Sequence, residues 1–67
     1  MDQRKKLSVT IDHWIEHNGA HMEEYKKWAQ TAGELGLDLV KAEIEEAMGK
    51  LIQSNRHLET ALKSMSP

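Results

Sequence analysis

Apolar residues recur at three- and four-residue spacing along the first half of the chain, with polar residues between them. This spacing is typical of an amphipathic helix, because residues three and four positions apart share one helical face. Ser8 and Thr10 are alternative N-cap residues, so the pattern predicts a helix from about Ser8 to Ala32. The apolar stripe of this helix consists of Leu7, Ile11, Trp14, Ile15, Met22, Tyr25, Ala29 and Ala32.

A second stripe of the same spacing follows a short segment that contains two glycines. Gly33 is expected to end the first helix in a left-handed conformation, and Gly36 gives the connection a second permissive point. The second stripe consists of Leu37, Val40, Ile44, Ala47, Met48, Leu51, Leu58 and Leu62. These features predict a turn over residues 33–36 and a helix over residues 37–65, in a single domain that spans residues 1–67.

The expected fold class is therefore all-α, because the chain has few β-branched residues and no alternation of period two. A connection this short makes the two helices antiparallel neighbours, which is an αα-hairpin. Two helices alone leave both apolar stripes incompletely covered, and 67 residues without cysteine offer no disulfide to stabilise so small a core. We expect two hairpins to pair into a homodimeric four-helix bundle.

Charge and hydropathy exclude several classes of partner. The formal net charge is −2, and the only basic cluster is Arg4-Lys5-Lys6 near the amino terminus, so a nucleic-acid partner is not expected. No apolar run approaches the roughly 20 residues of a membrane span, and no signal-peptide core follows Met1. The expected setting is the cytoplasm, without membrane attachment.

Two polar residues lie within the apolar stripes. Asn18 falls in the middle of the first stripe, and Asn55 falls between Leu51 and Leu58 in the second. A buried amide must find hydrogen-bond partners, so these residues either fix the register of the helices or lie at a solvated edge. No chemistry follows from either alternative.

Three histidines one helical turn apart are the chain's most concentrated chemistry. His13, His17 and His21 follow one flank of the first helix, since residues four positions apart lie above one another. Two imidazoles at this spacing can chelate one metal ion from a preformed rod. His13 and His21 lie about 12 Å apart along the helix axis, so one ion cannot take all three comfortably.

A tight site needs more than two ligands, and several residues could complete it. His13 and His17, the first candidate pair, could recruit His57, Glu16 or a residue of a second subunit, while His17 and His21 could use Glu24. His21 is either a ligand or a histidine at the edge of the core. Imidazole ligands suit zinc, nickel, cobalt and copper.

Catalytic motifs are weak or missing. The residues His13-Trp14-Ile15-Glu16-His17 match the H-x-x-E-H pattern of one class of zinc peptidase. A chain of this length has no second subdomain to form a substrate cleft, and a five-residue pattern is of low specificity. No Glu-x-x-His pair, phosphate-binding loop or serine nucleophile motif occurs, so an enzyme is not expected.

The histidine segment also carries a resemblance to a known family. The run His13-Trp14-x-x-His17-Asn18-x-x-His21 and the later Tyr25-x-x-Trp28-Ala29 resemble small two-helix domains of unknown function found in bacteria and archaea. Similar positions continue at Ile44-Glu45-x-Ala47 and Asn55-x-x-Leu58-x-x-Ala61-Leu62, so the likeness covers residues 11–62. The resemblance implies a helical hairpin in which the three histidines and Asn18 belong together. It implies no activity.

Two functions remain as hypotheses. The first is a small protein that binds a first-row transition metal through the histidine stripe, for storage, delivery or sensing. The alternative is a non-catalytic, self-associating interaction module without metal, which docks on itself or on a larger protein partner. Trp14, Tyr25 and Trp28 lie on the first helix, and aromatic residues are enriched at protein interfaces. An exposed Trp28 beside an apolar patch would favour the alternative.

Overall fold

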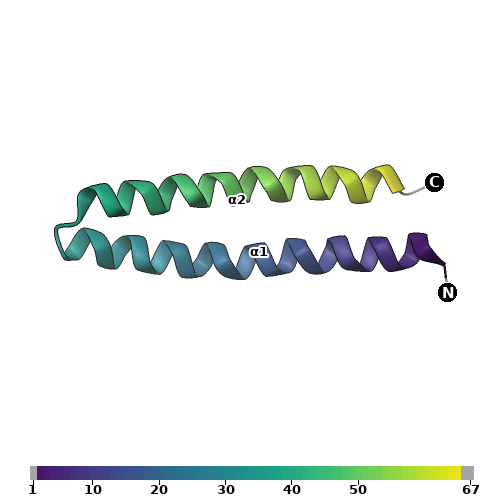
Figure 1. The fold of residues 1–67 in the computed structure, drawn as a ribbon, viewed down its shortest axis with the longest axis horizontal. Helices are drawn as coiled ribbons and strands as arrows, with labels where there is room; N and C mark the ends of the chain where they lie inside the picture. Colours follow the sequence, from purple (N-terminus) through teal and green to yellow (C-terminus); the bar gives the residue numbers. More distant parts are fainter. Residues whose placement is uncertain (1, 66–67) are drawn as a thin grey trace.

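The computed structural model describes residues 2–65 as a hairpin of two antiparallel α-helices (Figure 1). Helix α1 spans Gln3–Glu34 and helix α2 spans Asp38–Met65. They pack side by side in a rod 51 Å long, with the start of α1 and the end of α2 opposite the turn. Within residues 2–65 there is no strand, and neither helix is long and apolar enough to cross a membrane. The predicted all-α hairpin is confirmed, and Met1, Ser66 and Pro67 of the predicted domain lie outside the described residues.

Helix α1 begins five residues earlier than the expected start at Ser8, because a better cap lies upstream. Asp2 has extended backbone angles, and its carboxylate accepts a hydrogen bond from the Arg4 backbone N–H at 3.0 Å. That contact satisfies one of the amide groups that the first turn leaves without a partner. Ser8 and Thr10 lie inside the helix, where their hydroxyls donate to the backbone oxygens of Lys5 and Lys6 at 3.1 and 2.8 Å.

The turn is built around Gly36 rather than Gly33. Gly36 has a φ of +75°, the left-handed conformation that glycine adopts without steric cost, whereas Gly33 remains helical. The Leu37 N–H donates to the Ala32 oxygen at 2.8 Å, and the Gly36 N–H donates to the Gly33 oxygen at 3.0 Å. This pair of bonds is the Schellman arrangement, which satisfies carbonyl groups of the last helical turn. Helix α1 consequently runs two residues further than predicted.

An asparagine pair joins the helices near the middle of the rod. Asn18 donates from Nδ2 to the Oδ1 of Asn55 at 2.9 Å, and Asn55 donates from its own Nδ2 to the Ile15 oxygen at 3.2 Å. Asn55 is only 8% exposed, and no buried side-chain N or O atom in residues 2–65 lacks a partner. The structural reading of these two asparagines is confirmed: they fix the register of α1 against α2.

The core of the hairpin is thin. The buried apolar residues are Ile11, Ala29 and Ala32, and no side chain in the described part of the chain is fully buried. The mid-helix glycines, Gly19 and Gly49, have open space where a Cβ would lie, so close helix packing within the hairpin does not explain them. Two helices of this length therefore bury little apolar surface against each other.

Candidate metal centre and the surface around it

The histidine stripe lies along α1, and its closest pair is His17 with His21. Their Nε2 atoms are 3.0 Å apart, and the ring centroids are 4.5 Å apart in an edge-to-face arrangement. His13 stacks on His17 at a centroid distance of 6.0 Å. Within residues 2–65, no close contact joins the ring nitrogens of His13 to those of His17. The sequence placed His13 and His17 first, whereas the structure directs the ring nitrogens of His17 and His21 at each other.

The distance between these two nitrogens suits a shared ion as well as a hydrogen bond. Metal–imidazole bonds are about 2.0–2.1 Å long, so two such nitrogens on one ion lie roughly 2.9 to 3.4 Å apart, depending on the bond angle. As a hydrogen bond, the contact requires one ring to donate from Nε2 and the other to accept. His21 lies at the edge of the hairpin, with its side chain 44% exposed.

Glu24 lies beside the other nitrogen of His21. Its Oε2 is 3.9 Å from Nδ1, one helical turn along, which makes Glu24 a neighbour of the imidazole rather than a third ligand beside Nε2. A carboxylate at this position favours the tautomer that carries its proton on Nδ1. That tautomer leaves the Nε2 lone pair of His21 available to bind a metal.

The remaining predicted ligands do not join this pair. Glu16 and His57 are both exposed, and no three His, Cys, Asp or Glu side chains within residues 2–65 lie where they could hold a metal ion together. His57 follows the buried Asn55 by two positions, which is about 200° around α2 and therefore on the side away from α1. One chain thus supplies two converging imidazoles.

The two lateral sides of the hairpin differ, and the histidines lie on one of them. His17 and Gly19 flank Asn18, so they point about 100° to either side of the line that joins the helices. Gly19 lines a groove between the helices, which places His17 on the opposite side. A rotation of 100° per residue, applied in the same way to both helices, gives the other residues on the side of His17. We call this surface the histidine face; it is formed by Trp14, His17, His21 and Trp28 of α1 and Val40, Ala47 and Leu58 of α2.

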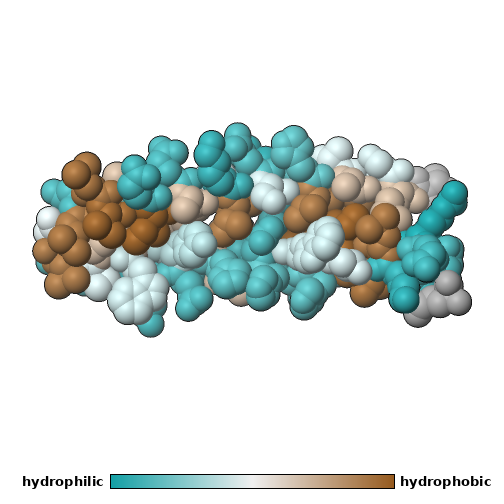
Figure 2. Space-filling view, in the orientation of Figure 1, coloured by the Kyte–Doolittle hydropathy of each residue, from teal (hydrophilic) through white to brown (hydrophobic). Residues whose placement is uncertain are grey.

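The histidine face is rich in exposed apolar side chains. Trp14 is 48% exposed, Trp28 is 58% exposed and Val40 is 46% exposed. An apolar patch over the first half of α2 is lined by Leu39, Val40, Glu43, Ile44 and Ala47. In Figure 2, hydrophobic side chains gather near the turn and again toward the chain ends, with a hydrophilic stretch along the middle of α1 between them. This face therefore leaves apolar side chains in contact with solvent on both sides of the histidines.

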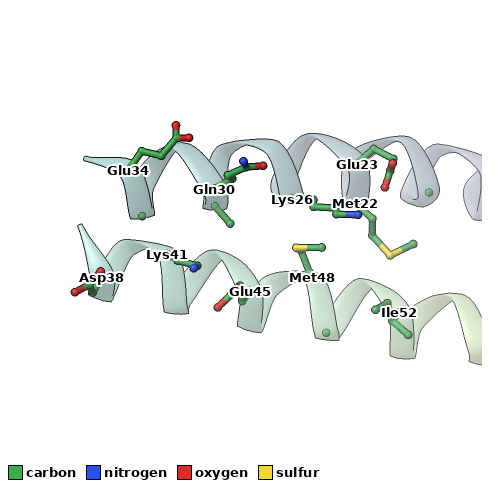
Figure 3. A pocket seen from close by; sticks show the side chains of 14 residues that line it. Met22, Glu23, Lys26, Gln30, Glu34, Asp38, Lys41, Glu45, Met48 and Ile52 are labelled. Carbon is green, nitrogen blue, oxygen red and sulfur yellow. The ribbon is translucent and has the colours of Figure 1, made fainter. Parts of the chain in front are cut away.

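The opposite side carries the groove of about 1100 Å³ (Figure 3). Met22 and Met48 project into the space between the helices, and charged side chains follow both rims. Its exposed large apolar residue is Ile52, at 41%. The acidic rim residues are Glu23, Glu34, Asp38 and Glu45, and the basic ones are Lys26 and Lys41. The groove thus combines apolar side chains between the helices with charged side chains along its rims.

The sequence analysis missed part of the exposed apolar surface. Leu39 and Ile52 fall outside both predicted stripes, yet they are 83% and 41% exposed. Leu39 stands in the run Leu37-Asp38-Leu39-Val40, which places apolar side chains on more than one side of the start of α2. A helical wheel of this run is the signal that would have found the patch beside the turn.

Comparisons with known proteins identify a family and no activity. Searches of the curated proteins and of the solved structures found no match to the chain. One family model matches residues 7–65, which include the whole histidine segment, both asparagines and the turn. This match confirms the predicted resemblance to a small domain of unknown function. The chain belongs to the family described as Domain of unknown function (DUF8180).

Proposed function

We propose that the protein is a non-catalytic, self-associating helical module, whose hairpins pair through the histidine face into a dimeric four-helix bundle. The observation that carries this proposal is the exposure of Trp14, Trp28 and Val40 on one side of the hairpin. Isolated exposed apolar residues are normal on protein surfaces, whereas an apolar patch flanked by polar residues is typical of an interface. Cytoplasmic residence stays a prediction.

The surface area supports the same proposal. The hairpin exposes 5510 Å², whereas a compact folded monomer of this mass exposes about 4300 Å². The excess of about 1200 Å² per chain is what one subunit of a large, permanent dimer interface buries. Because no side chain of residues 2–65 is fully buried in the single hairpin, pairing would also supply the core that it lacks.

Sedimentation equilibrium of the untagged full chain tests the proposal. We expect a dimer at micromolar concentration and about a 1000-fold weaker association in a Trp28→Glu variant, since each interface tryptophan contributes at least about 2 kcal/mol and a homodimer loses two of them. Ile52→Glu is the matched control, because Ile52 is an exposed apolar residue on the opposite side. A wild-type chain that stays monomeric, or equal losses in both variants, would contradict the proposal. A monomer that binds a larger protein through Trp28 would indicate a heterologous partner instead.

Metal binding through the histidine stripe is the second candidate function. It is favoured by the 3.0 Å approach of the Nε2 atoms of His17 and His21. Storage, delivery and sensing are the roles open to such a site. Calorimetric titration with zinc, nickel, cobalt and copper(II) tests it, with His17→Ala as the variant that should lose binding. Binding that is only millimolar, or unchanged in that variant, would contradict this function.

A further inference from the structure

We infer that two copies of the chain complete one metal site, in which His17 and His21 of each hairpin bind a single divalent transition-metal ion at the dimer twofold axis. The inference rests on the proposed self-association and adds to it a ligand, a stoichiometry and an orientation of the two copies. One hairpin directs two imidazole nitrogens at a common point and supplies no third ligand from residues 2–65. A second copy supplies the missing pair.

The position of the histidine pair along the rod carries the first step. Helix α1 spans Gln3–Glu34, so its midpoint lies between Asn18 and Gly19, and the two histidines lie within about 4 Å of it along the axis. When two hairpins pair with their turns at opposite ends, a twofold axis runs across the rod at mid-length. Each residue near the middle of α1 in one hairpin then lies at the same height along the rod as the identical residue of the other hairpin. Only residues at this height can share one ion across the twofold axis.

The direction of the side chains carries the second step. His17 and His21 lie about 100° and 60° around α1 from Asn18, toward the histidine face that pairing would cover. In the crosswise arrangement, α1 lies on α1 of the second copy, so the two histidine pairs face each other. In the other closed arrangement, with the twofold axis along the rod, α1 lies on α2 of the second copy. At the level of the histidine pair α2 offers Leu58 of the histidine face and the neighbouring Ser54, and neither is a ligand for such an ion.

Glu24 acts in this site as a positioning residue. Its carboxylate lies 3.9 Å from the Nδ1 atom of His21, where its negative charge favours the tautomer with the proton on Nδ1 and leaves Nε2 for the ion. Its side chain is 67% exposed, so it remains available for this contact. Imidazole ligands that lose such a partner typically bind their metal 10- to 100-fold more weakly.

The first experiment titrates the untagged chain with zinc. Calorimetry measures the binding, and sedimentation equilibrium measures the dimerisation. We expect one zinc ion per two chains, and dimerisation that is about 100-fold tighter when free zinc is about 100 times its dissociation constant. His17→Ala and His21→Ala should remove both effects. His13→Ala and His57→Ala are the matched controls and should retain both effects. His13 stacks outside the His17–His21 pair, and His57 lies on the side of α2 away from α1. Glu24→Gln should keep the stoichiometry while weakening zinc binding about tenfold.

The second measurement establishes the orientation. A spin label on a Leu35→Cys variant, at the exposed turn, reports the distance between the two turns in the zinc-loaded dimer. Crosswise pairing places the backbones at this position about 48 Å apart, since 16 residues of helix separate Leu35 from the mid-length axis on each side. Pairing along the rod would bring both turns to the same end and give a far shorter distance, which overturns the site.

The outcomes separate this inference from the proposed function. A dimer that forms equally with and without zinc, and binds none, overturns the shared site and leaves the self-association standing. One zinc ion per chain with an unchanged dimer constant shows that the histidine pair binds alone, which overturns the bridge. A chain that remains monomeric with and without zinc overturns the site and the proposed function together.

Discussion

Replacing Asn55 with alanine tests the account of how the two helices hold their register. The substitution removes the hydrogen bond from Asn18 at 2.9 Å and the hydrogen bond to the Ile15 oxygen at 3.2 Å. It also leaves the Asn18 amide and the Ile15 carbonyl without these partners between the helices. A hydrogen bond contributes about 0.5–1.5 kcal/mol, and a buried group left unpaired costs about 1–3 kcal/mol. We expect the free energy of unfolding to fall by about 2 kcal/mol.

The second half of this prediction concerns coupling between the asparagines. Asn18→Ala removes one hydrogen bond and leaves Asn55 its bond to Ile15, so it should cost about 1 kcal/mol. The double variant should lose less than the sum of the single variants, by about 0.5–1.5 kcal/mol, because both remove the same bond between the two amides.

Urea unfolding followed by far-ultraviolet circular dichroism measures these values, at one fixed protein concentration because a dimer's stability depends on it. Gln53→Ala is the matched control: Gln53 is exposed on the same helix, and its side chain makes none of the hydrogen bonds found within residues 2–65. A loss below about 0.5 kcal/mol for Asn55→Ala, or strictly additive losses in the double variant, would refute the role of the pair.

Four further substitutions test the turn and the helix surfaces. Gly36→Ala should destabilise the hairpin by about 1–2 kcal/mol in urea unfolding, because its φ of +75° places a Cβ against the backbone; an unchanged midpoint would contradict this. Gly19→Ala and Gly49→Ala should each stabilise the protein by up to about 1 kcal/mol, since alanine favours the helix and the space is open; a loss in thermal unfolding would indicate that another chain packs there. Val40→Glu should weaken dimerisation while circular dichroism of the diluted monomer still shows full helix, and a loss of helix instead would place Val40 in the core of the hairpin.

The elements of the fold follow from the order of residues along the chain. The three- and four-residue apolar spacing predicted two helices, and the two-glycine segment predicted the turn between them. The errors concern helix ends, where local competition between caps decides the outcome. Asp2 caps the first turn of α1, so the helix begins before Ser8 and Thr10. The Schellman hydrogen bonds place the left-handed conformation at Gly36. A periodic pattern is insensitive to such choices because it describes faces rather than ends.

The candidate site was also predicted only in part. Spacing alone identified the histidine stripe and placed the two asparagines on the inner faces, because both depend only on rotation about one helix axis. Which imidazoles meet depends on side-chain rotation: the structure pairs the Nε2 atoms of His17 and His21 and leaves His13 stacked outside them.

By itself, then, the sequence determined that this chain is two amphipathic helices with a short turn and one concentrated row of imidazoles. Only the tertiary structure decided that Asn18 meets Asn55 and that His57 points away from α1. It also decided that Trp14, Trp28 and Val40 stay exposed on the side that carries the histidines. The physical reason is that periodicity fixes directions around a single axis. The register and facing of two axes are fixed by contacts between residues 37 positions apart in the chain, such as the 2.9 Å bond between the two amides.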